Sequence, residues 1–228
     1  ELGVLSACRD YAEFEEMAKA ELNLVISPVV LAAAKKMEKK LGIPWLRHLR
    51  SYRLDEIDEM YAELSKQLNT DLTEAAAEFR KKAEEKITET LAVIGDYPVA
   101  VDYQAVLRPF NLALALTEYG FKVGLVASNG IPAFEKESAK KLKEMVPDIV
   151  FTDPMHPQSV QYPHEGEEYL CIGFDCGYIT KSKKLVELVE DEGLFGYSGV
   201  MELMNRMQDA FLTKADVNKM IEGAGLII

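Results

Sequence analysis

The sequence contains few cysteines and no long apolar run, and these two features restrict the classes of protein to which it can belong. Its 228 residues include three cysteines, Cys8, Cys171 and Cys176. These are too few and too unevenly spaced for a disulfide framework, so a reducing cytoplasm is the expected location. No run of about 18 apolar residues occurs, and we therefore expect no membrane-spanning helix and no membrane partner.

Nucleotide-binding fingerprints and an excess of positive charge are also missing. The loop Ser128–Pro132 lacks the G-x-G-x-x-G spacing, and no G-x-x-x-x-G-K-[ST] motif is present. The 26 basic residues against 38 acidic ones give a net charge of −12. This balance disfavours a nucleic-acid phosphate backbone as a partner. The first residues include neither Met nor a basic-then-apolar signal pattern, and we interpret the start as a cut inside a longer chain.

The most informative segment present is Glu21–Trp45. Within it, Leu22–Ile26 is a short apolar run typical of a strand buried on both faces. Ser27 and Pro28 then open a helix, because proline is tolerated in a first helical turn. One face of that helix is apolar and consists of Val30, Ala33, Met37 and Leu41.

A glycine and a second strand complete this unit. Gly42 is expected to end the helix in a left-handed conformation, and Ile43-Pro44-Trp45 begins the next strand. The segment thus predicts a β-α-β unit. Ser27 stands at the carboxyl end of its first strand, where such sheets bind ligands.

Strands and helices alternate along the rest of the chain, which favours parallel, doubly wound sheets. In the first half we predict a strand at Gly3–Leu5 and helices near 11–20 and at 54–68. A charged helix at about 72–94 follows, with a buried stripe of Ala76, Phe79, Ala83, Ile87 and Leu91. In the second half the predicted strands are 99–101, 122–127, 149–151 and 169–174. The predicted helices there end near Gly120 or span 134–145 and 198–212.

This pattern predicts an α/β fold with two Rossmann-like, doubly wound parallel-sheet domains. The first domain would cover residues 1–70, a linking helix 71–95, and the second domain with its C-terminal helix 96–228. A single merged sheet is the alternative. The stretch 152–168 carries three prolines and two histidines and is predicted to be a loop.

Three ordered segments resemble the nitrogenase component 1 superfamily. The first is Asn23-Leu24-Val25 with the following helix and its ending MEKKLGIPW, the second is Leu107-Arg108-Pro109, and the third is FGYSG at 195–199. The likeness is to the α subunit of the molybdenum–iron protein and its cofactor-scaffold relative. It implies that this chain is a C-terminal two-domain portion without the domain that carries the cluster cysteines.

The resemblance also implies four cofactor-pocket positions: Ser27, Arg108, Phe195 and Gly196. The cysteine that binds the family's metallocluster falls at Ser27, its histidine ligand falls at Phe195, and an arginine that contacts the cluster falls at Arg108. A serine hydroxyl is a poor substitute for a thiolate on iron, and phenylalanine cannot ligate a metal. We therefore expect neither the iron–molybdenum cofactor nor dinitrogen reduction, and assign no metal ligand. For Arg108, bridging two domains or capping a helix is the alternative role.

Further candidates lie in the second half of the chain. Cys171 and Cys176 form a C-x4-C pair, although Cys171 is more simply a small buried hydrophobe in a strand. His156 and His164, with carboxylates nearby, are more simply surface residues than metal ligands. Asp175 follows a strand in a predicted tight turn, where it is either an acid–base group or a turn cap.

The resemblance implies a subunit that receives electrons from an ATP-dependent iron–sulfur reductase and acts on an unknown substrate. An iron–sulfur cluster would be bound in another part of the full-length protein. The partners would also include a sister subunit in an oligomer. The fragment alone would hold no cofactor and would be inactive. The alternative is a non-catalytic assembly or carrier scaffold for a metallocluster precursor or a tetrapyrrole-like ligand. A third hypothesis is a subunit whose domains mainly serve to form a hetero-oligomer. No catalytic residue is assigned.

Overall fold

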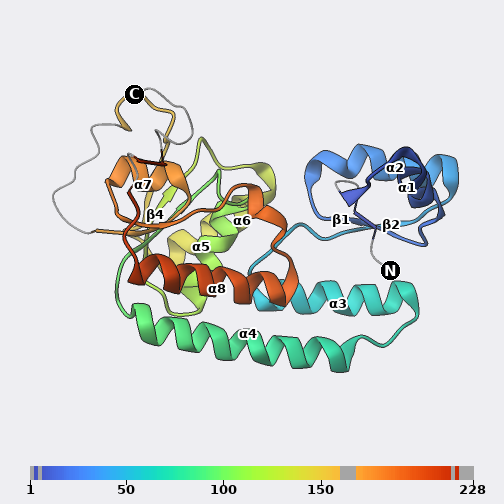
Figure 1. Ribbon diagram of the computed structural model, residues 1–228, viewed down its shortest axis with the longest axis horizontal. Coiled ribbons are helices and arrows are strands. Elements are labelled where there is room, and N and C mark those ends of the chain that lie inside the picture. The colour runs from blue at the N-terminus through green and yellow to red at the C-terminus, as the bar shows by residue number, and fades with distance from the viewer. Residues whose placement is uncertain (1–2, 5–6, 160–167, 217–218, 221–228) are drawn as a thin grey trace. The chain divides into compact units, whose positions relative to one another are not determined.

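The computed structural model describes residues 3–4, 7–159, 168–216 and 219–220 (Figure 1). By their internal contacts the residues divide into two compact units. The first comprises Glu1–Arg50 and Asp58–Glu74, and the second Ser51–Ile57 and Ala75–Ile228. Each contains a parallel sheet with helices, which confirms the α/β fold class. The domain boundaries at 70 and 95 stay a prediction.

The first unit contains the predicted β-α-β motif. Strands β1 (Asn23–Val25) and β2 (Trp45–Arg47) pair in parallel, with Asn23 opposite Trp45. Between them lie the 3-10 helix η3 (Pro28–Val30) and helix α2 (Leu31–Leu41). Gly42 ends α2 with a φ of 73° and donates its N–H to the Glu38 carbonyl, as a left-handed glycine cap does. Helix α1 (Tyr11–Glu16) and the 3-10 helix η2 (Met17–Lys19) precede β1.

Burial in this unit differs from the prediction. In β1 only Val25 is buried, so the strand is not buried on both faces, because the described sheet has one partner strand. In α2 the buried residue is Ala34, whereas Val30 and Leu41 of the predicted apolar face are 41% and 54% exposed. The strand predicted at Gly3–Leu5 is also wrong for the described Gly3 and Val4, and Leu5 lies outside the described residues.

Two long helices follow, close to their predicted bounds. Helix α3 spans Leu54–Leu68 and helix α4 spans Thr73–Ile94. The predicted stripe of α4 is buried at Ala83 and Ile87, but Phe79 is 44% exposed and burial continues instead to Ile94. Helical periodicity identifies the apolar face of a helix but not how far along it the packing partner extends.

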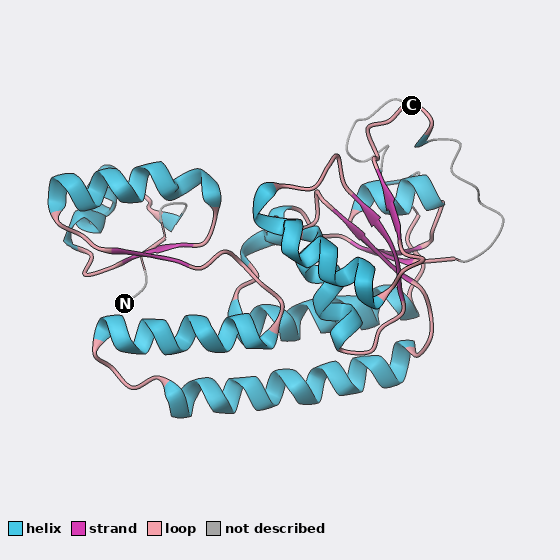
Figure 2. Cartoon of the chain, turned by 180° about the vertical axis from the view of Figure 1, so that it is seen from behind, coloured by secondary structure: helices cyan, strands magenta, loops and turns pink. Residues whose placement is uncertain are grey.

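The second unit is built on a five-stranded parallel sheet in the order β5-β4-β3-β6-β7. Figure 2 shows its strands in magenta. Its strands are β3 (Val99–Asp102), β4 (Val123–Ala127), β5 (Val150–Thr152), β6 (Leu170–Ile172) and β7 (Lys184–Val186). The chain winds outward from β3 through β4 to β5, and then returns to place β6 on the other side of β3. The strand order therefore reverses between β3 and β6, which is the switch point where doubly wound sheets bind ligands.

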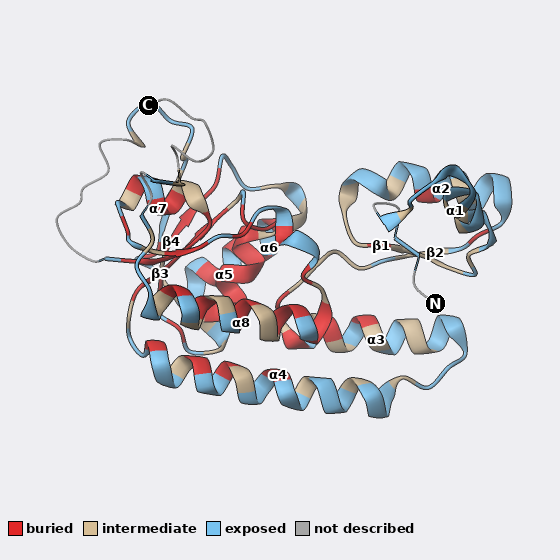
Figure 3. Ribbon diagram, viewed as in Figure 1, coloured by how far each residue is buried: buried red, intermediate tan, exposed pale blue. Residues whose placement is uncertain are grey.

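Helices pack along this sheet and complete the core. Helix α5 (Pro109–Glu118) packs against β3, β4 and α6 (Lys136–Met145), which follows the 3-10 helix η4 (Ala133–Glu135). Helices α7 (Phe174–Thr180) and α8 (Gly196–Leu212) pack against β6 and β7, and the 3-10 helix η6 (Glu190–Gly193) precedes α8. Figure 3 shows buried residues along the sheet and α5. All four residues of β3 are buried because the strand is central in the sheet.

Two details of the second half were not predicted correctly. Residues 174–180 form helix α7 rather than a tight turn, and strand β7 was missed. Residues 153–159 of the predicted loop contain no strand, and residues 160–167, with His164, lie outside the described residues. Within the described residues, no helix is both long and apolar enough to cross a membrane.

Candidate functional site

Ser27 belongs to the first unit and stands two residues beyond the end of β1. It is the residue before η3, with extended backbone angles of −139° and 143°. Its half-buried hydroxyl makes no capping hydrogen bond to that short helix. The other predicted positions, Arg108, Phe195 and Gly196, belong to the second unit.

The switch point of the five-stranded sheet is occupied by the carboxylate of Asp102. Asp102 ends β3, has no exposed surface, and accepts hydrogen bonds from the N–H groups of Gln104 at 2.8 Å and Cys176 at 2.9 Å. The second of these groups lies in the first turn of α7. Burial raises the pKa of Asp102 to about 6, although these N–H groups favour its ionised form. The start of α7 is thus capped by the chain itself.

Gly173 allows the loop after β6 to approach Asp102. Its φ is 107°, and a Cβ at this position would lie 2.5 Å from the Asp102 Cβ and 2.9 Å from the Ala105 Cβ. The backbone of the loop after β6 therefore packs directly against side chains at the end of β3 and in the loop that follows it. Asp175 follows in the first turn of α7, where its carboxylate accepts a hydrogen bond from the Gln104 side chain at 2.8 Å.

Asp191 joins the loops that carry Arg108 and Phe195. Its side chain is buried and accepts a 2.8 Å hydrogen bond from the Tyr52 hydroxyl and a 3.1 Å hydrogen bond from the Leu107 N–H. The backbones also pair, because the Asp191 N–H donates to the Ala105 carbonyl at 2.8 Å. The structure therefore brings together two of the three loops that the sequence singled out.

This junction has a strained backbone. Glu190, Asp191 and Glu192 have φ values of 48°, 64° and 42°, in the left-handed region that favours glycine. The Glu190 N–H donates to the Gln104 carbonyl at 2.8 Å, and the Leu194 N–H donates to the Asp191 carbonyl at 2.7 Å. These bonds hold the conformation in place. Strain of this kind persists only where the surrounding structure over-determines it, and it is common at functional sites.

Arg108 is the residue immediately before α5, and that helix start is capped by Glu135 rather than by Arg108. The Glu135 carboxylate accepts hydrogen bonds from the N–H groups of Asn111 at 2.8 Å and Phe110 at 3.2 Å. Glu135 has no exposed surface, and burial raises its pKa to about 7. The N–H groups and Arg108 oppose this shift. A carboxylate of this chain thus occupies the anion-binding end of the helix.

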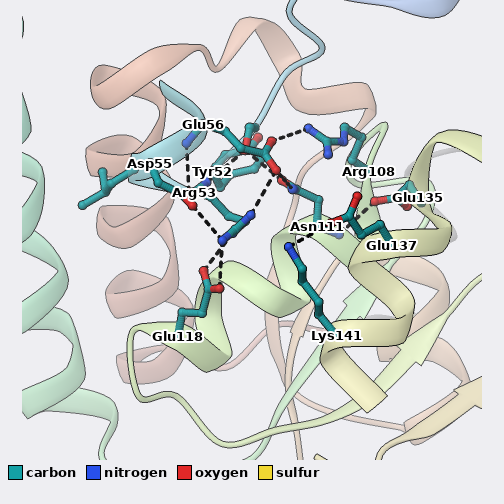
Figure 4. Close-up of polar contacts among 12 residues, drawn as sticks. Tyr52, Arg53, Asp55, Glu56, Arg108, Asn111, Glu118, Glu135, Glu137 and Lys141 are labelled. Carbon is teal, nitrogen blue, oxygen red and sulfur yellow. Dashed lines mark hydrogen bonds and ion pairs between the residues drawn. The ribbon is translucent and has the colours of Figure 1, made fainter. Parts of the chain in front are cut away.

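The Arg108 guanidinium forms an ion pair with Glu56 at the start of α3 (Figure 4). Its Nη1 donates to Glu56 Oε2 at 2.7 Å, and Asn111 Nδ2 donates to the other carboxylate oxygen at 2.9 Å. Burial alone would raise the pKa of Glu56, but the hydrogen bond and charge of Arg108, together with smaller contributions from Ser51 and Arg53, lower that pKa. Arg53 adds a contact to Glu56 at 3.2 Å and holds Glu118 through two bonds of 2.8 and 2.9 Å.

Phe195 and Gly196 begin α8. Phe195 is half-buried with extended backbone angles of −154° and 142°, and Gly196 is buried with a φ of 59°. Because Phe195 follows the loop joined by Asp191, it lies on the same edge of the sheet as Arg108. Its ring offers no donor atom to a metal.

The two cysteines of the C-x4-C pair are buried in the second unit. Cys171 lies in β6 with no exposed surface, which confirms the prediction of a small buried hydrophobe in a strand. Its Sγ is 3.3 Å from the Thr180 hydroxyl. Burial raises the pKa of the neighbouring Cys176 thiol well above its usual value. In the part of the chain that the structure describes, no group of three or more His, Cys, Asp or Glu residues is arranged to hold a metal.

Sequence reasoning missed the four carboxylates that organise this edge: Glu56, Asp102, Glu135 and Asp191. Asp102 could have been predicted as a site residue, since it directly follows the predicted strand 99–101 at its carboxyl end, where such sheets bind ligands. The other three could not, because acidic residues in charged segments are usually solvated. Their partners are distant in sequence, as with Tyr52 and Asp191.

Known proteins provide an independent comparison. The family described as nitrogenase component 1 type oxidoreductase matches residues 2–212 of this chain. A solved structure described as "Nitrogenase Cp1 at pH 6.5" is similar, with a TM-score of 0.62 and 15% sequence identity. That similarity covers 93% of this chain and 49% of the other, so this chain spans about half the length of that protein. No protein with a curated description matches the sequence.

Proposed function

Since the chain belongs to the nitrogenase component 1 type oxidoreductase family, we propose that it is part of an oxidoreductase subunit that acts on a substrate other than dinitrogen. The family match over residues 2–212 is the observation that supports the oxidoreductase class. The proposal on the substrate is supported by the donor atoms at the positions where the family resemblance places its cluster ligands.

These donor atoms do not fit an iron–molybdenum cofactor. Phe195 has no atom that can coordinate a metal, and the Ser27 hydroxyl is a hard, protonated donor where soft iron sites use thiolate. Arg108 already contacts a carboxylate of this chain at 2.7 Å. We propose that Arg108, Phe195 and Gly196 of the second unit contact an organic ligand instead, and that Ser27 of the first unit does not act as a cluster ligand. A conjugated, tetrapyrrole-like ring suits the half-buried Phe195 because aromatic rings stack on one another.

Electrons would come from outside the described residues. By analogy with the family, we propose an ATP-dependent iron–sulfur reductase as the donor, a sister subunit in an oligomer, and an iron–sulfur cluster in another part of the full-length protein. The cytoplasm is the proposed location, since such clusters and the free thiols of this chain need reducing conditions. Within the second unit, the carboxylates of Asp191 and Glu135 would hold the two loops that position Arg108 and Phe195.

The test uses the full-length protein, purified anaerobically with its sister subunit and reductase. We expect visible absorbance from an iron–sulfur cluster and oxidation of the reductase that requires both ATP and an organic acceptor. Dinitrogen should not be reduced. If protein that contains the iron–sulfur cluster reduces dinitrogen to ammonia, the substrate proposal is overturned. If the full-length protein has neither a cluster nor reductase-dependent turnover, the oxidoreductase proposal is overturned.

A non-catalytic scaffold is the second candidate. It is favoured by the way the chain occupies its own helix starts, because Asp102 accepts an N–H group of α7 and Glu135 accepts an N–H group of α5. A scaffold would bind the organic ligand or a cluster precursor but would not turn it over. The same anaerobic assay separates the two, because only the enzyme consumes reductant in proportion to the acceptor.

A further inference from the structure

Glu56 is an ionised carboxylate that contacts Arg108 directly at the start of α5. The Nη1–Oε2 distance is 2.7 Å, and the Arg108 side chain is only 12% exposed. A guanidinium beside a helix N-terminus normally attracts an anion, because the helix dipole adds to its charge. In this protein the anion is a side chain of the same chain. An external anion would therefore have to compete with Glu56 for Arg108.

Glu56 is held in place by more than Arg108. Its Oε1 accepts hydrogen bonds from Asn111 Nδ2 at 2.9 Å and from Arg53 Nη1 at 3.2 Å. Asn111 has no exposed surface, and its own side-chain oxygen accepts a 2.9 Å hydrogen bond from the Ser51 hydroxyl. Moving Glu56 aside would leave a buried amide donor without its acceptor, which is costly. The ion pair is therefore a built arrangement rather than a surface contact.

The carboxyl group of Glu135 also makes the start of α5 less available to an anion. Glu135 accepts the N–H groups of Phe110 and Asn111, which are the groups that an external anion would use at this helix start. An anionic ligand group would thus find the N–H groups taken and Glu56 already beside Arg108. Like charges this close repel strongly where water is scarce.

We infer that Glu56 determines the charge class of the ligand, and that the ligand group meeting Arg108 is uncharged. The inference rests on the proposed function, since it names the class of ligand for the same site. It differs from the usual role of an arginine at a helix start, which is that its guanidinium binds a carboxylate of the ligand. Glu56 acts here as a specificity-determining residue through Arg108.

Replacing Glu56 with glutamine should convert this position into an anion site. The probe is inorganic phosphate, and the readout is the midpoint of thermal unfolding of the purified protein as phosphate is titrated against sodium chloride of equal ionic strength. We expect Glu56→Gln to be stabilised by phosphate with an apparent Kd at least about tenfold below that of the unsubstituted protein. The double variant Glu56→Gln/Arg108→Gln should lose this response.

Glu118→Gln is the matched control. Glu118 is as exposed as Glu56, at 32% against 27%, and it also holds a poorly exposed arginine, Arg53. Arg53 keeps two other carboxylate partners, Asp55 and Glu56, so no anion site should appear. A phosphate response in Glu118→Gln equal to that in Glu56→Gln would overturn the inference, because it would reflect general loss of negative charge.

If the unsubstituted protein binds phosphate as tightly as Glu56→Gln and Arg108→Gln abolishes that binding, Glu56 does not neutralise Arg108. If Glu56→Gln folds but gains no phosphate response, the inference is wrong. If it is unfolded in chloride, millimolar phosphate should restore its circular dichroism, and failure to do so would overturn the inference. The assay uses neither reductase nor acceptor, so failure of the proposed oxidoreductase activity leaves its result unaffected.

Discussion

Glu135 places a carboxyl group without exposed surface against two backbone N–H groups of α5. Its pKa rises from 4.5 to about 7 because burial penalises the charged form. The folded protein therefore binds this proton more tightly than the unfolded chain. The resulting stabilisation is fully present below pH 4.5 and is lost as the pH rises through about 7. Asp102, with a pKa raised to about 6, acts in the same direction.

The first prediction concerns pH and Glu135. The free energy of unfolding of Glu135→Gln should fall less steeply than that of the unsubstituted protein between about pH 5 and pH 8, because glutamine does not titrate. Urea unfolding at several pH values measures both slopes. The control is Glu137→Gln in α6, whose carboxylate pKa is lowered by Lys141 and so titrates below this window. Parallel curves for Glu135→Gln and the unsubstituted protein would contradict the assignment.

The second prediction concerns Asp191. Asp191→Asn removes one carboxylate acceptor from the buried pair formed by Tyr52 and Leu107, and should lower the free energy of unfolding by about 1–3 kcal/mol. Chemical denaturation measures this loss. The exposed Glu187→Gln is the control and should stay within about 0.5 kcal/mol. In the double variant with Tyr52→Phe the losses should be less than additive, since both changes remove the same hydrogen bond; strict additivity would argue against the contact.

At the residue scale, the sequence predicts positions better than partners. Arg108 was placed correctly at the start of a helix, since a proline follows it and an apolar run begins there. Its ion pair with Glu56 was not predictable, because the two residues are on different helices and their pairing depends on tertiary packing. The same reason hid Asp191, whose acidic neighbours suggest an exposed turn.

At the scale of elements, the loops after β3, β6 and β7 are joined into one edge. Gly173 brings the loop after β6 onto Asp102, and Asp191 ties the loop after β7 to the residues before α5. A change in one loop should therefore be felt in the others.

The third prediction compares two glycines with positive φ. Gly173→Ala should destabilise the protein by about 3 kcal/mol or more, because its Cβ would lie 2.5 Å from the Asp102 Cβ in addition to the backbone strain. Gly193→Ala, with a φ of 82° and no atom within 4 Å of its new Cβ, should lose only about 1–2 kcal/mol. Thermal and urea unfolding measure both. Equal losses would mean that the two loops do not approach as closely as described.

Element prediction succeeded where helical period and end signals agree. Helix α3 has the predicted bounds of Leu54–Leu68, since its apolar spacing is regular over four turns. Helix α7 was not predicted, because its FDCGYIT sequence has a glycine in the middle and strong β-formers around it. Its helix is stabilised by the Asp102 cap and by packing on the sheet, which local propensity does not register.

At the scale of the molecule, buried side chains are concentrated in the second unit. Among the described residues of the first unit, the buried apolar ones are Val25, Ala34, Ile43 and Met60. The central strand β3 alone contributes Val99, Ala100 and Val101, each with no exposed surface. Local opening costs least where few apolar contacts hold the backbone.

The fourth prediction follows from this distribution. Amide hydrogen exchange should be slowest in β3, β4 and β6 and markedly faster in β1 and β2, by at least about a hundredfold in protection. Mass spectrometry of peptic peptides measures the difference, and peptides from the exposed N-terminal half of α4 provide a fast-exchanging reference within a regular helix. Equal protection in β1 and β3 would show that both units open together.

The family was recognisable from three short segments because they lie at strand ends and helix starts, where backbone geometry restricts the choice of residue. The segment with Gly42, whose φ is 73°, and the segment with Gly196, whose φ is 59°, are examples. The charge class of the ligand could not be read in this way. It depends on Glu56, which lies outside all three segments and reaches Arg108 only in the folded chain.

The position of β3 in the sheet also has a consequence for how the chain acquires its structure. Val99 of β3 pairs with Val123 on one side and with Leu170 on the other, so the second pairing closes a loop of roughly seventy residues. Parallel pairings this distant form slowly, and a ribosome would release β3 and β4 well before β6 was available. During that interval one edge of β3 is unpaired and apolar, so the nascent chain should depend on chaperones until β6 emerges.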